Sequence, residues 1–240
     1  MARIALVTGG TRGLGRAIAV ALRAEGCTVI AVYRSNDEAA KQLQTEHRVR
    51  TYKWDVADFD ACALGIAQVE REAGPIDILV NNAGITSDVS LHHMTHEQWQ
   101  RVIDVNLGSM FNMCRHVIEG MRERNFGRII NISSVNAQKG QFGQTNYAAT
   151  KAGILGFTRA LALEGAHKNV TVNAIAPGYC DTDMMSTVAP DVLKTVIARI
   201  PVGRLGMPSD VARTAVFLAK DEAGFITGAT FSINGGQYMS

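Results

Sequence analysis

The sequence predicts an α/β fold in which one doubly wound parallel sheet of about seven strands carries helices on both faces. Two observations predict this fold. Short apolar segments rich in β-branched residues alternate with longer amphipathic segments along the chain. The apolar segments lack a polar–apolar alternation, so we expect both faces of each strand to be buried. Because no linker, repeat or low-complexity segment interrupts the pattern, we expect a single domain over residues 1–240.

The expected strands and helices follow one another in strict alternation. The strands are expected at residues 4–7, 28–33, 51–54, 76–81, 128–132, 171–176 and 230–233. The helices are expected at residues 13–25, 37–46, 58–73, 96–124, 145–167 and 209–219. Segments 85–95 and 178–202 break the rhythm, and both follow strand ends, where doubly wound sheets bind their ligands. Both are therefore candidate walls of a site, and residues 180–203 are a candidate substrate lid.

Composition excludes several classes of protein. The net charge is +2 and there is no long basic run, which argues against bulk attraction to nucleic acid or to an acidic membrane surface. Four cysteines are widely spread without a CxxC pair, so we expect neither a disulfide framework nor a metal site. No apolar run is long enough for a signal peptide core or a membrane span. Scattered thiols suit a reducing compartment, and we expect a cytoplasmic protein.

A glycine-rich loop joins the first expected strand to the first expected helix. Gly9, Gly13 and Gly15 have the spacing GxxxGxG, with Thr11, Arg12 and Leu14 between them. Glycine lets the backbone approach a ligand closely, and a helix N-terminus directs N–H groups and a positive dipole end at it. A tight turn without a ligand is the alternative. The position after the first strand favours a pyrophosphate, although the spacing matches the GxGxxG fingerprint of Rossmann-like folds only in its logic.

The residue after the second expected strand indicates which dinucleotide is bound. NAD-binding proteins place an acidic residue there, whereas this chain has Arg34. Together with Arg12, Arg34 could clamp the 2′-phosphate of NADPH, although each arginine alone could be a solvated surface residue. Later strand ends offer further cofactor contacts. After the third strand, Asp55 and Val56 could contact the adenine, with Asp55 accepting from its amine. After the fourth strand, Asn82, Ala83 and Gly84 allow close backbone approach.

Four residues form a candidate catalytic group. Tyr147 and Lys151 are four residues apart and would share a helix face, where a lysine cation would lower the tyrosine pKa toward neutrality. A tyrosine tuned in this way can transfer a proton near pH 7. Ser134 follows the fifth strand and could hydrogen-bond the same substrate oxygen, while Asn106 is a polar residue inside a helix and needs a partner. Each could instead be an ordinary surface, cap or core residue, so the hypothesis rests on all four together.

With these motifs in place, the chain resembles the short-chain dehydrogenase/reductase family over essentially its full length. The features that carry the resemblance are Thr8-Gly9, Gly13, Gly15, Asn81-Asn82-Ala83-Gly84, Asn106, Ser134, Tyr147, Lys151 and Pro177-Gly178 with Thr182. The resemblance implies that Tyr147 is the general acid/base and that Ser134 polarises the carbonyl. It implies that Lys151 binds the nicotinamide ribose and tunes Tyr147, and that Asn106 anchors a proton-relay water. Pro177, Gly178 and Thr182 would position the nicotinamide.

Four segments also resemble the acetoacetyl-CoA reductase subfamily of polyhydroxybutyrate synthesis. They are residues 131–147 with 84–88, Pro177-Gly178-Tyr179, and residues 231–236. This resemblance implies NADPH-dependent reduction of acetoacetyl-CoA to (R)-3-hydroxybutyryl-CoA. It implies an acyl pocket lined by Gln141, Phe142, Gln144 and Tyr179, with Asp88 nearby. Glutamine donors could orient the second carbonyl, and the two aromatic rings could close on a short acyl chain. Lys139, Lys194 and Arg199 are candidate partners of the CoA phosphates.

Two other functions remain open from the sequence. One is a 3-oxoacyl-[acyl-carrier-protein] reductase, which would share the catalytic group and NADPH. The other is a non-catalytic NADP-sensing regulator, against which the intact Ser134, Tyr147 and Lys151 argue. The family resemblance also implies a homotetramer. Helices 96–124 and 145–167 would pack across one interface, and the last strand with the C-terminal tail across another.

Overall fold

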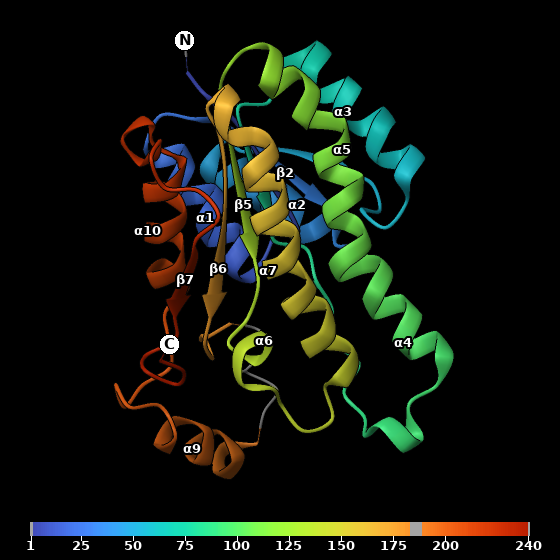
Figure 1. Cartoon of the computed structure of the whole chain (residues 1–240), viewed down its shortest axis with the longest axis vertical. Helices are drawn as coiled ribbons and strands as arrows, with labels where there is room; N and C mark the ends of the chain where they lie inside the picture. Colours follow the sequence, from blue (N-terminus) through green and yellow to red (C-terminus); the bar gives the residue numbers. More distant parts are fainter. Residues whose placement is uncertain (1, 183–188, 240) are drawn as a thin grey trace.

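The computed structural model describes residues 2–182 and 189–239, and it contains one parallel seven-stranded sheet (Figure 1). The strands are β1 (Ile4–Thr8), β2 (Thr28–Tyr33), β3 (Arg50–Lys53), β4 (Ile78–Asn81), β5 (Gly127–Ile132), β6 (Val170–Pro177) and β7 (Thr230–Ile233). Their spatial order is β3-β2-β1-β4-β5-β6-β7. All seven predicted strands are confirmed to within two residues at each end. The direction of winding reverses between β1 and β4, which places a crevice at the carboxyl ends of these strands.

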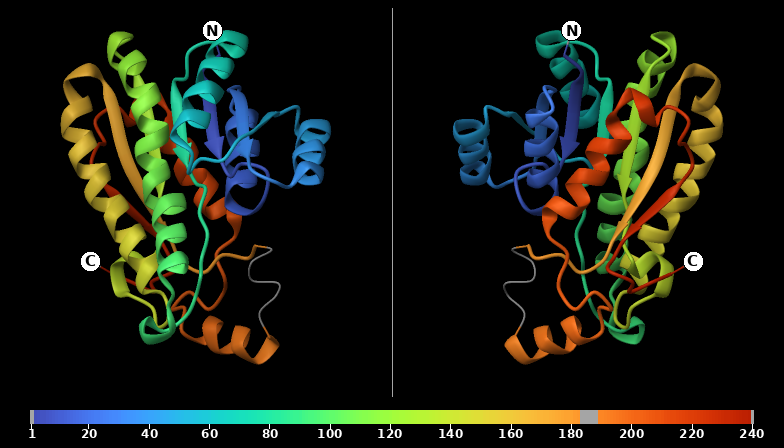
Figure 2. Two further views of the ribbon diagram at one scale, coloured as in Figure 1. Left: turned by 90° about the vertical axis from the view of Figure 1, so that its right-hand side faces the viewer. Right: turned by 90° about the vertical axis from the view of Figure 1, so that its left-hand side faces the viewer.

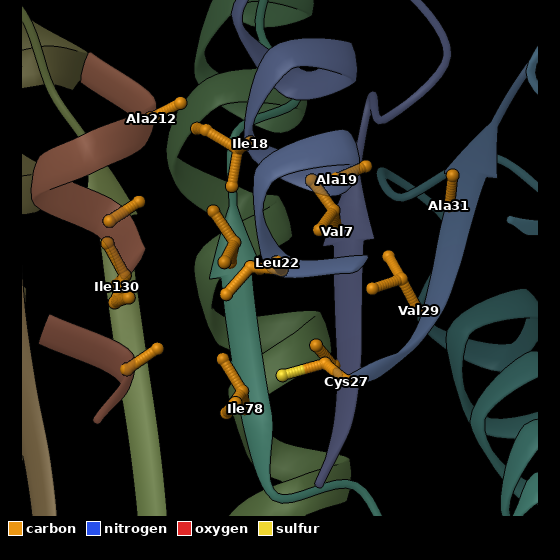
Figure 3. Close-up of a cluster of buried hydrophobic side chains, with 14 of the residues drawn as sticks. Val7, Ile18, Ala19, Leu22, Cys27, Val29, Ala31, Ile78, Ile130 and Ala212 are labelled. Atoms are coloured by element: carbon orange, nitrogen blue, oxygen red, sulfur yellow. The ribbon is translucent and has the colours of Figure 1, made fainter. Parts of the chain in front are cut away.

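Each face of the sheet has its own apolar core. Neighbouring residues of one strand enter opposite cores, as Ala5 and Val7 of β1 do on one face and Ile4 and Leu6 on the other. This two-sided burial confirms the interpretation of strands without polar alternation. The first core lies under helices α1 (Gly13–Ala24) and α10 (Pro208–Ala219), and Figure 3 shows its side chains between α1, α10 and the strands.

The second core lies under α3 (Phe59–Ala73), α5 (Ser109–Glu123) and α7 (Thr145–Gly165). The side views in Figure 2 place α5 and α7 on the opposite side of the sheet from α1. Helix α2 (Asp37–His47) connects β2 to β3. The predicted arrangement of helices on both faces is therefore confirmed.

The long helix expected over residues 96–124 is wrong as a single helix. The chain forms α4 (His96–Ile103), then a π-helical turn η2 (Asp104–Gly108), then α5. Within the turn, the amide group of Asn106 exchanges two hydrogen bonds with the backbone of Ile85. A π-turn adds a residue to the helix, and such turns occur where a side chain serves a site outside the helix.

Two further helices lie beyond the carboxyl ends of the strands (Figure 1). They are α6 (Asn136–Lys139), which is too short to show a periodicity in sequence, and α9 (Pro190–Ala198), inside the expected lid. Residues 183–188 of that lid, 180–203, lie outside the described residues. The four cysteines are buried free thiols. None of the described helices has the length and apolar character that crossing a membrane requires.

Candidate active site

The glycine loop between β1 and α1 depends on glycine for two physical reasons. Gly9 and Gly13 have φ angles of 60° and 53°, in the left-handed region that favours glycine. Gly15 has no room for a side chain. A Cβ atom there would lie 2.2 Å from the Gly9 carbonyl oxygen and 2.5 Å from Asn82 Nδ2. The N-terminal end of α1 therefore approaches the loop as closely as its backbone allows.

The loop after β4 holds this glycine loop in place through hydrogen bonds. The Thr8 hydroxyl accepts from the backbone N–H groups of Asn82 (2.9 Å) and Ala83 (3.1 Å). In return, Asn82 Nδ2 donates to the carbonyls of Thr8 (2.9 Å) and Gly9 (3.2 Å). The Asn82 side chain, expected to contact the cofactor, thus holds the loop that would do so. Thr8 belongs to the motif that carries the family resemblance, but it was not among the predicted site residues.

The segment after β6 also reaches the glycine loop. A Cβ atom on Gly13 would lie 3.8 Å from the Thr182 methyl group. Pro177 ends β6, and Gly178 follows it so closely against Asn234 that a Cβ atom would lie 2.9 Å from the Asn234 Cα. The structure therefore brings Gly178 and Thr182 to the same edge of the sheet as the glycine loop.

Arg34 and Asp55, both predicted to contact the cofactor, face one another at the ends of β2 and β3. Arg34 Nη1 lies 3.6 Å from Asp55 Oδ2, and both side chains are partly exposed. Asp55 Oδ1 also accepts from the Ala57 N–H at 3.0 Å. A cavity of about 450 Å³ adjoins the pair. It is lined by Arg34, Asp55, Ala57, His96, Glu97, Gln100, Arg101, Asp104 and Val105. Arg12 is exposed at the N-cap of α1 and is not part of this lining.

The four predicted catalytic residues converge beside Gly84. A Cβ atom on Gly84 would lie 3.4 Å from both Asn106 Oδ1 and Lys151 Nζ. Lys151 is buried, lies 5.7 Å from the centre of the Tyr147 ring, and donates to the Ile132 carbonyl at 2.7 Å. Ser134 is buried after β5 and lies close enough to Tyr147 to lower the pKa of its phenol. Residues from β5, η2 and α7 thus form one polar cluster at the carboxyl edge of the sheet.

The pKa of Tyr147 moves in the direction opposite to the prediction. Burial raises the pKa of Tyr147, and the charges of Asp88 and Tyr179 raise it further, while the hydrogen bond with Ser134 lowers it. Burial also lowers the pKa of Lys151 to about 8. The expected lowering of the tyrosine pKa by Lys151 is therefore wrong for this structure, because desolvation of the phenolate dominates. At neutral pH, Tyr147 is a protonated phenol and can act as a proton donor.

Asn106 has the partner that a buried amide requires. The Ile85 N–H donates to Asn106 Oδ1 (2.8 Å), and Asn106 Nδ2 donates to the Ile85 carbonyl (2.9 Å). Asn106 Nδ2 also reaches Thr150 Oγ1 at 3.3 Å, and this hydroxyl donates to the Tyr147 carbonyl at 2.8 Å. Asn106 therefore ties the segment after Gly84 to the helix that carries Tyr147 and Lys151. Thr150 is a further site residue that the sequence analysis did not single out.

The residues expected to line the acyl pocket divide into two groups. Asp88 and Gln144 are in direct contact, since Gln144 Nε2 donates to Asp88 Oδ2 at 2.7 Å. Tyr179 is half-buried, and its ring centre lies 5.6 Å from Lys139 Nζ. In contrast, Gln141 is exposed and the Phe142 side chain is 89% exposed. The expected closure of Phe142 on an acyl chain is not present in this structure.

Two of the candidate CoA-phosphate partners, Lys194 and Arg199, lie on or next to α9. Lys194 Nζ is 3.7 Å from the carboxylate of Asp191 in an exposed pair, and Arg199 is exposed at the end of the helix. The third candidate, Lys139, belongs to α6 and lies over Tyr179. Lys139 is therefore the candidate that the structure places beside a predicted substrate-binding residue.

Comparisons with known proteins show the family of the chain. A family model described as enoyl-(acyl carrier protein) reductase matches residues 9–237. An acetoacetyl-CoA reductase of Shinella zoogloeoides is 59% identical over 240 residues, which cover 100% of both chains. One of Rhizobium meliloti (strain 1021) is 59% identical over 241 residues, again 100% of both. A 3-oxoacyl-[acyl-carrier-protein] reductase of Vibrio harveyi is 44% identical over 238 residues, 99% of this chain and 98% of that protein. The chain is thus an oxidoreductase that belongs to the short-chain dehydrogenase/reductase family.

Proposed function

We propose that the protein reduces acetoacetyl-CoA to (R)-3-hydroxybutyryl-CoA with NADPH, as a step in polyhydroxybutyrate synthesis. The observation that carries the reductase chemistry is the cluster of Ser134, Tyr147 and Lys151 beside Gly84. Support for the substrate comes from the end-to-end similarity to acetoacetyl-CoA reductases. The similarity to a carrier-protein reductase is lower, which favours the CoA thioester.

The residues at the carboxyl edge of the sheet fit a nicotinamide dinucleotide. The close approach at Gly15 packs the glycine loop against the start of α1, and backbone N–H groups at a helix N-terminus suit a pyrophosphate. In this proposal Gly9, Thr11, Gly13 and Leu14 share that cradle, and Arg12 and Arg34 hold the 2′-phosphate. The remaining contacts are Asp55 and Val56 for adenine, and Ala83, Gly84, Lys151, Pro177, Gly178 and Thr182 for the nicotinamide half. NADPH, when bound, supplies the hydride.

The side chains of the chain supply the proton and hold the substrate oxygen. The Ser134 hydroxyl donates a hydrogen bond to the carbonyl oxygen that is reduced, and the Tyr147 phenol transfers its proton to that oxygen. The phenolate that remains is stabilised by the Lys151 ammonium group 5.7 Å from the ring centre. Asn106 holds the segment at Ile85 in place and, in the family pattern, anchors the water that returns the proton.

A comparison of acetoacetyl-CoA with acetoacetyl-carrier protein tests the proposed substrate. We expect kcat/KM for acetoacetyl-CoA to exceed that for acetoacetyl-carrier protein by about tenfold or more, a difference of about 1.4 kcal/mol in transition-state stabilisation. The measurement is steady-state NADPH oxidation with both substrates at matched cofactor concentration. A preference for the protein-bound substrate would assign the carrier-protein reductase function. Absence of NADPH oxidation with every small β-ketoacyl thioester would instead favour the NADP-sensing regulator.

Charge reversal at the two arginines tests the choice of NADPH. The double change Arg34→Asp with Arg12→Ala is expected to shift the NADPH/NADH ratio of kcat/KM toward NADH by roughly tenfold. The reason is that a 2′-phosphate loses two guanidinium partners and meets a second carboxylate beside Asp55. The matched control is Arg50→Asp with Arg23→Ala, which makes the same charge change at the amino end of β3 and the last turn of α1. An unchanged ratio in the first double variant refutes the arginine clamp.

We further propose that the chain works as a cytoplasmic homotetramer and that residues 180–203 act as a lid. Large apolar side chains on α5 and α7 are solvent-exposed in the single chain, including Phe111 and Leu163. Phe225, shortly before β7, is fully exposed. Such side chains favour burial against other copies of the chain. For the lid, support comes from Thr182, which already lies against the glycine loop.

A further inference from the structure

Asn136 is a buried polar residue that lies between the two proposed catalytic hydroxyl residues. It begins α6, two positions after Ser134, and only 6% of its surface is exposed. Its backbone N–H donates to Ser134 Oγ at 3.1 Å. Its side-chain Nδ2 donates to Gln144 Oε1 at 2.9 Å, and Gln144 is the N-cap of the helix that carries Tyr147. Asn136 therefore links the turn that holds Ser134 to the start of α7.

The hydrogen bonds from Asn136 continue through Gln144 to the carboxylate of Asp88, and this carboxylate fixes the direction of both side-chain bonds. Asp88 accepts but does not donate, so Gln144 must present Nε2 to it, at 2.7 Å. The other end of the Gln144 amide, Oε1, can only accept, so Asn136 must donate to it with Nδ2. As a result, Asn136 Oδ1 is left buried without a donor among the described residues. The buried asparagine thus has one allowed orientation, set by Asp88 through Gln144.

We propose that Asn136 is a positioning residue: the chain Asp88–Gln144–Asn136 sets the placement of Ser134 relative to Tyr147. This proposal rests on the proposed function, because it assigns Ser134 and Tyr147 their roles. The Asn136 N–H occupies a lone pair of Ser134 Oγ, so the Ser134 hydrogen is directed elsewhere and can serve Tyr147 or the substrate oxygen. Helix α6 has four residues, and the Asn136–Gln144 bond is the side-chain link that joins it to α7.

The proposal changes the role expected for Gln144. Its amide joins protein groups at both ends, Asp88 at one and Asn136 at the other. Its contribution therefore includes holding the catalytic hydroxyls, in addition to the role expected for it in the acyl pocket. Breaking the hydrogen bonds between Asp88, Gln144 and Asn136 should lower kcat more than it raises KM, since positioning acts on the transition state.

Two single changes and their combination test the direction of the chain. Asn136→Asp replaces the donor that faces Gln144 with an acceptor, and Gln144 cannot rotate without turning its own oxygen toward Asp88. We expect kcat with acetoacetyl-CoA to fall by about tenfold or more, with KM changed by less than about threefold. Asp88→Asn keeps an acceptor for Gln144 and is the reference for the double variant, because Asp88 also belongs to the expected acyl pocket.

The double variant Asp88→Asn with Asn136→Asp is the decisive protein. The amide introduced at position 88 can donate to Gln144 Oε1, and Gln144 Nε2 can donate to the carboxylate introduced at position 136. The chain is then rebuilt in the reverse direction with the same net charge. We expect kcat of the double variant to lie within about threefold of that of Asp88→Asn, although the double variant retains the change that damages Asn136→Asp.

The outcomes separate this proposal from the proposed function. A double variant no more active than Asn136→Asp overturns the proposal, as does an Asn136→Asp variant that raises KM while keeping kcat. A wild-type protein that does not reduce acetoacetyl-CoA refutes the proposed function instead. Thermal unfolding of wild type, the two single variants and the double variant is a second test of the proposal. We expect Asn136→Asp to lower Tm by several degrees and the double variant to recover it, and additive losses in Tm overturn the chain.

Discussion

Replacing Tyr147 with phenylalanine is expected to lower kcat for acetoacetyl-CoA by about three orders of magnitude and to leave NADPH binding within about threefold of wild type. The magnitude is that of losing a positioned general acid. The phenylalanine keeps the ring that packs near Lys151 and removes only the hydroxyl that faces Ser134. NADPH oxidation measures the first quantity, and fluorescence titration of NADPH measures the second.

Tyr52→Phe is a matched control for this change. The Tyr52 hydroxyl donates to Glu72 at 2.6 Å from strand β3 at the edge of the sheet, so kcat and NADPH binding should both be unchanged. A Tyr147→Phe protein with more than about a tenth of wild-type kcat would contradict the acid role, since it exceeds the residual rate expected without an acid. Lys151, whose pKa is about 8, would then become the candidate proton donor.

Replacing Gly15 with alanine is expected to weaken NADPH binding by about 100-fold or more, about 2.7 kcal/mol. The added methyl group would lie 2.2 Å from the Gly9 carbonyl oxygen and 2.9 Å from the Gly9 carbonyl carbon, and both are backbone atoms. Either the loop or the start of α1 must move, and both form the proposed pyrophosphate cradle. The dissociation constant of NADPH and the midpoint of thermal unfolding are measured together.

Two further glycine changes keep this test interpretable. In α7, a Cβ atom on Gly156 meets nothing within 4 Å, so Gly156→Ala should leave NADPH binding unchanged and raise stability by up to about 1 kcal/mol. Gly13→Ala has room for its methyl group but a φ of 53°, which costs about 1–2 kcal/mol, and should give a folded protein with weaker NADPH binding if Gly15→Ala does not fold. If both loop variants, Gly15→Ala and Gly13→Ala, bind NADPH as wild type does, the loop is not part of the cofactor site.

Local patterns in the sequence predicted the sheet and most of its helices well. Strands of buried β-branched residues and amphipathic helices leave separate signatures, so all seven strands and the ends of α1 and α7 could be placed to within about two residues. The break at η2 could not be placed, because it depends on Asn106 meeting Ile85, which is 21 residues away in the sequence. Helix α6 left no signature because a single turn has no periodicity.

The site was predicted as a set of residues, whereas their electrostatics were not. The four-residue spacing of Tyr147 and Lys151 correctly predicted that they lie near one another, as the 5.7 Å from Nζ to the ring centre shows. The sign of the Tyr147 pKa shift was wrong, because burial of the phenol raises its pKa. Likewise, Arg34 was expected to hold a 2′-phosphate together with Arg12, and its pairing with Asp55 was not predicted.

The sequence by itself therefore determined the α/β sheet, the glycine loop and the identity of the polar residues at the strand ends. Each of these follows from short-range sterics and from burial along a single segment. Only the tertiary structure decided which polar groups satisfy one another. Asp88, Gln144 and Asn136 come from the loop after β4, the cap of α7 and the helix after β5, and they form one chain because the fold brings these ends together. Hydrogen bonds of this kind depend on distances between atoms that are remote in sequence, and a pattern along one segment does not contain those distances.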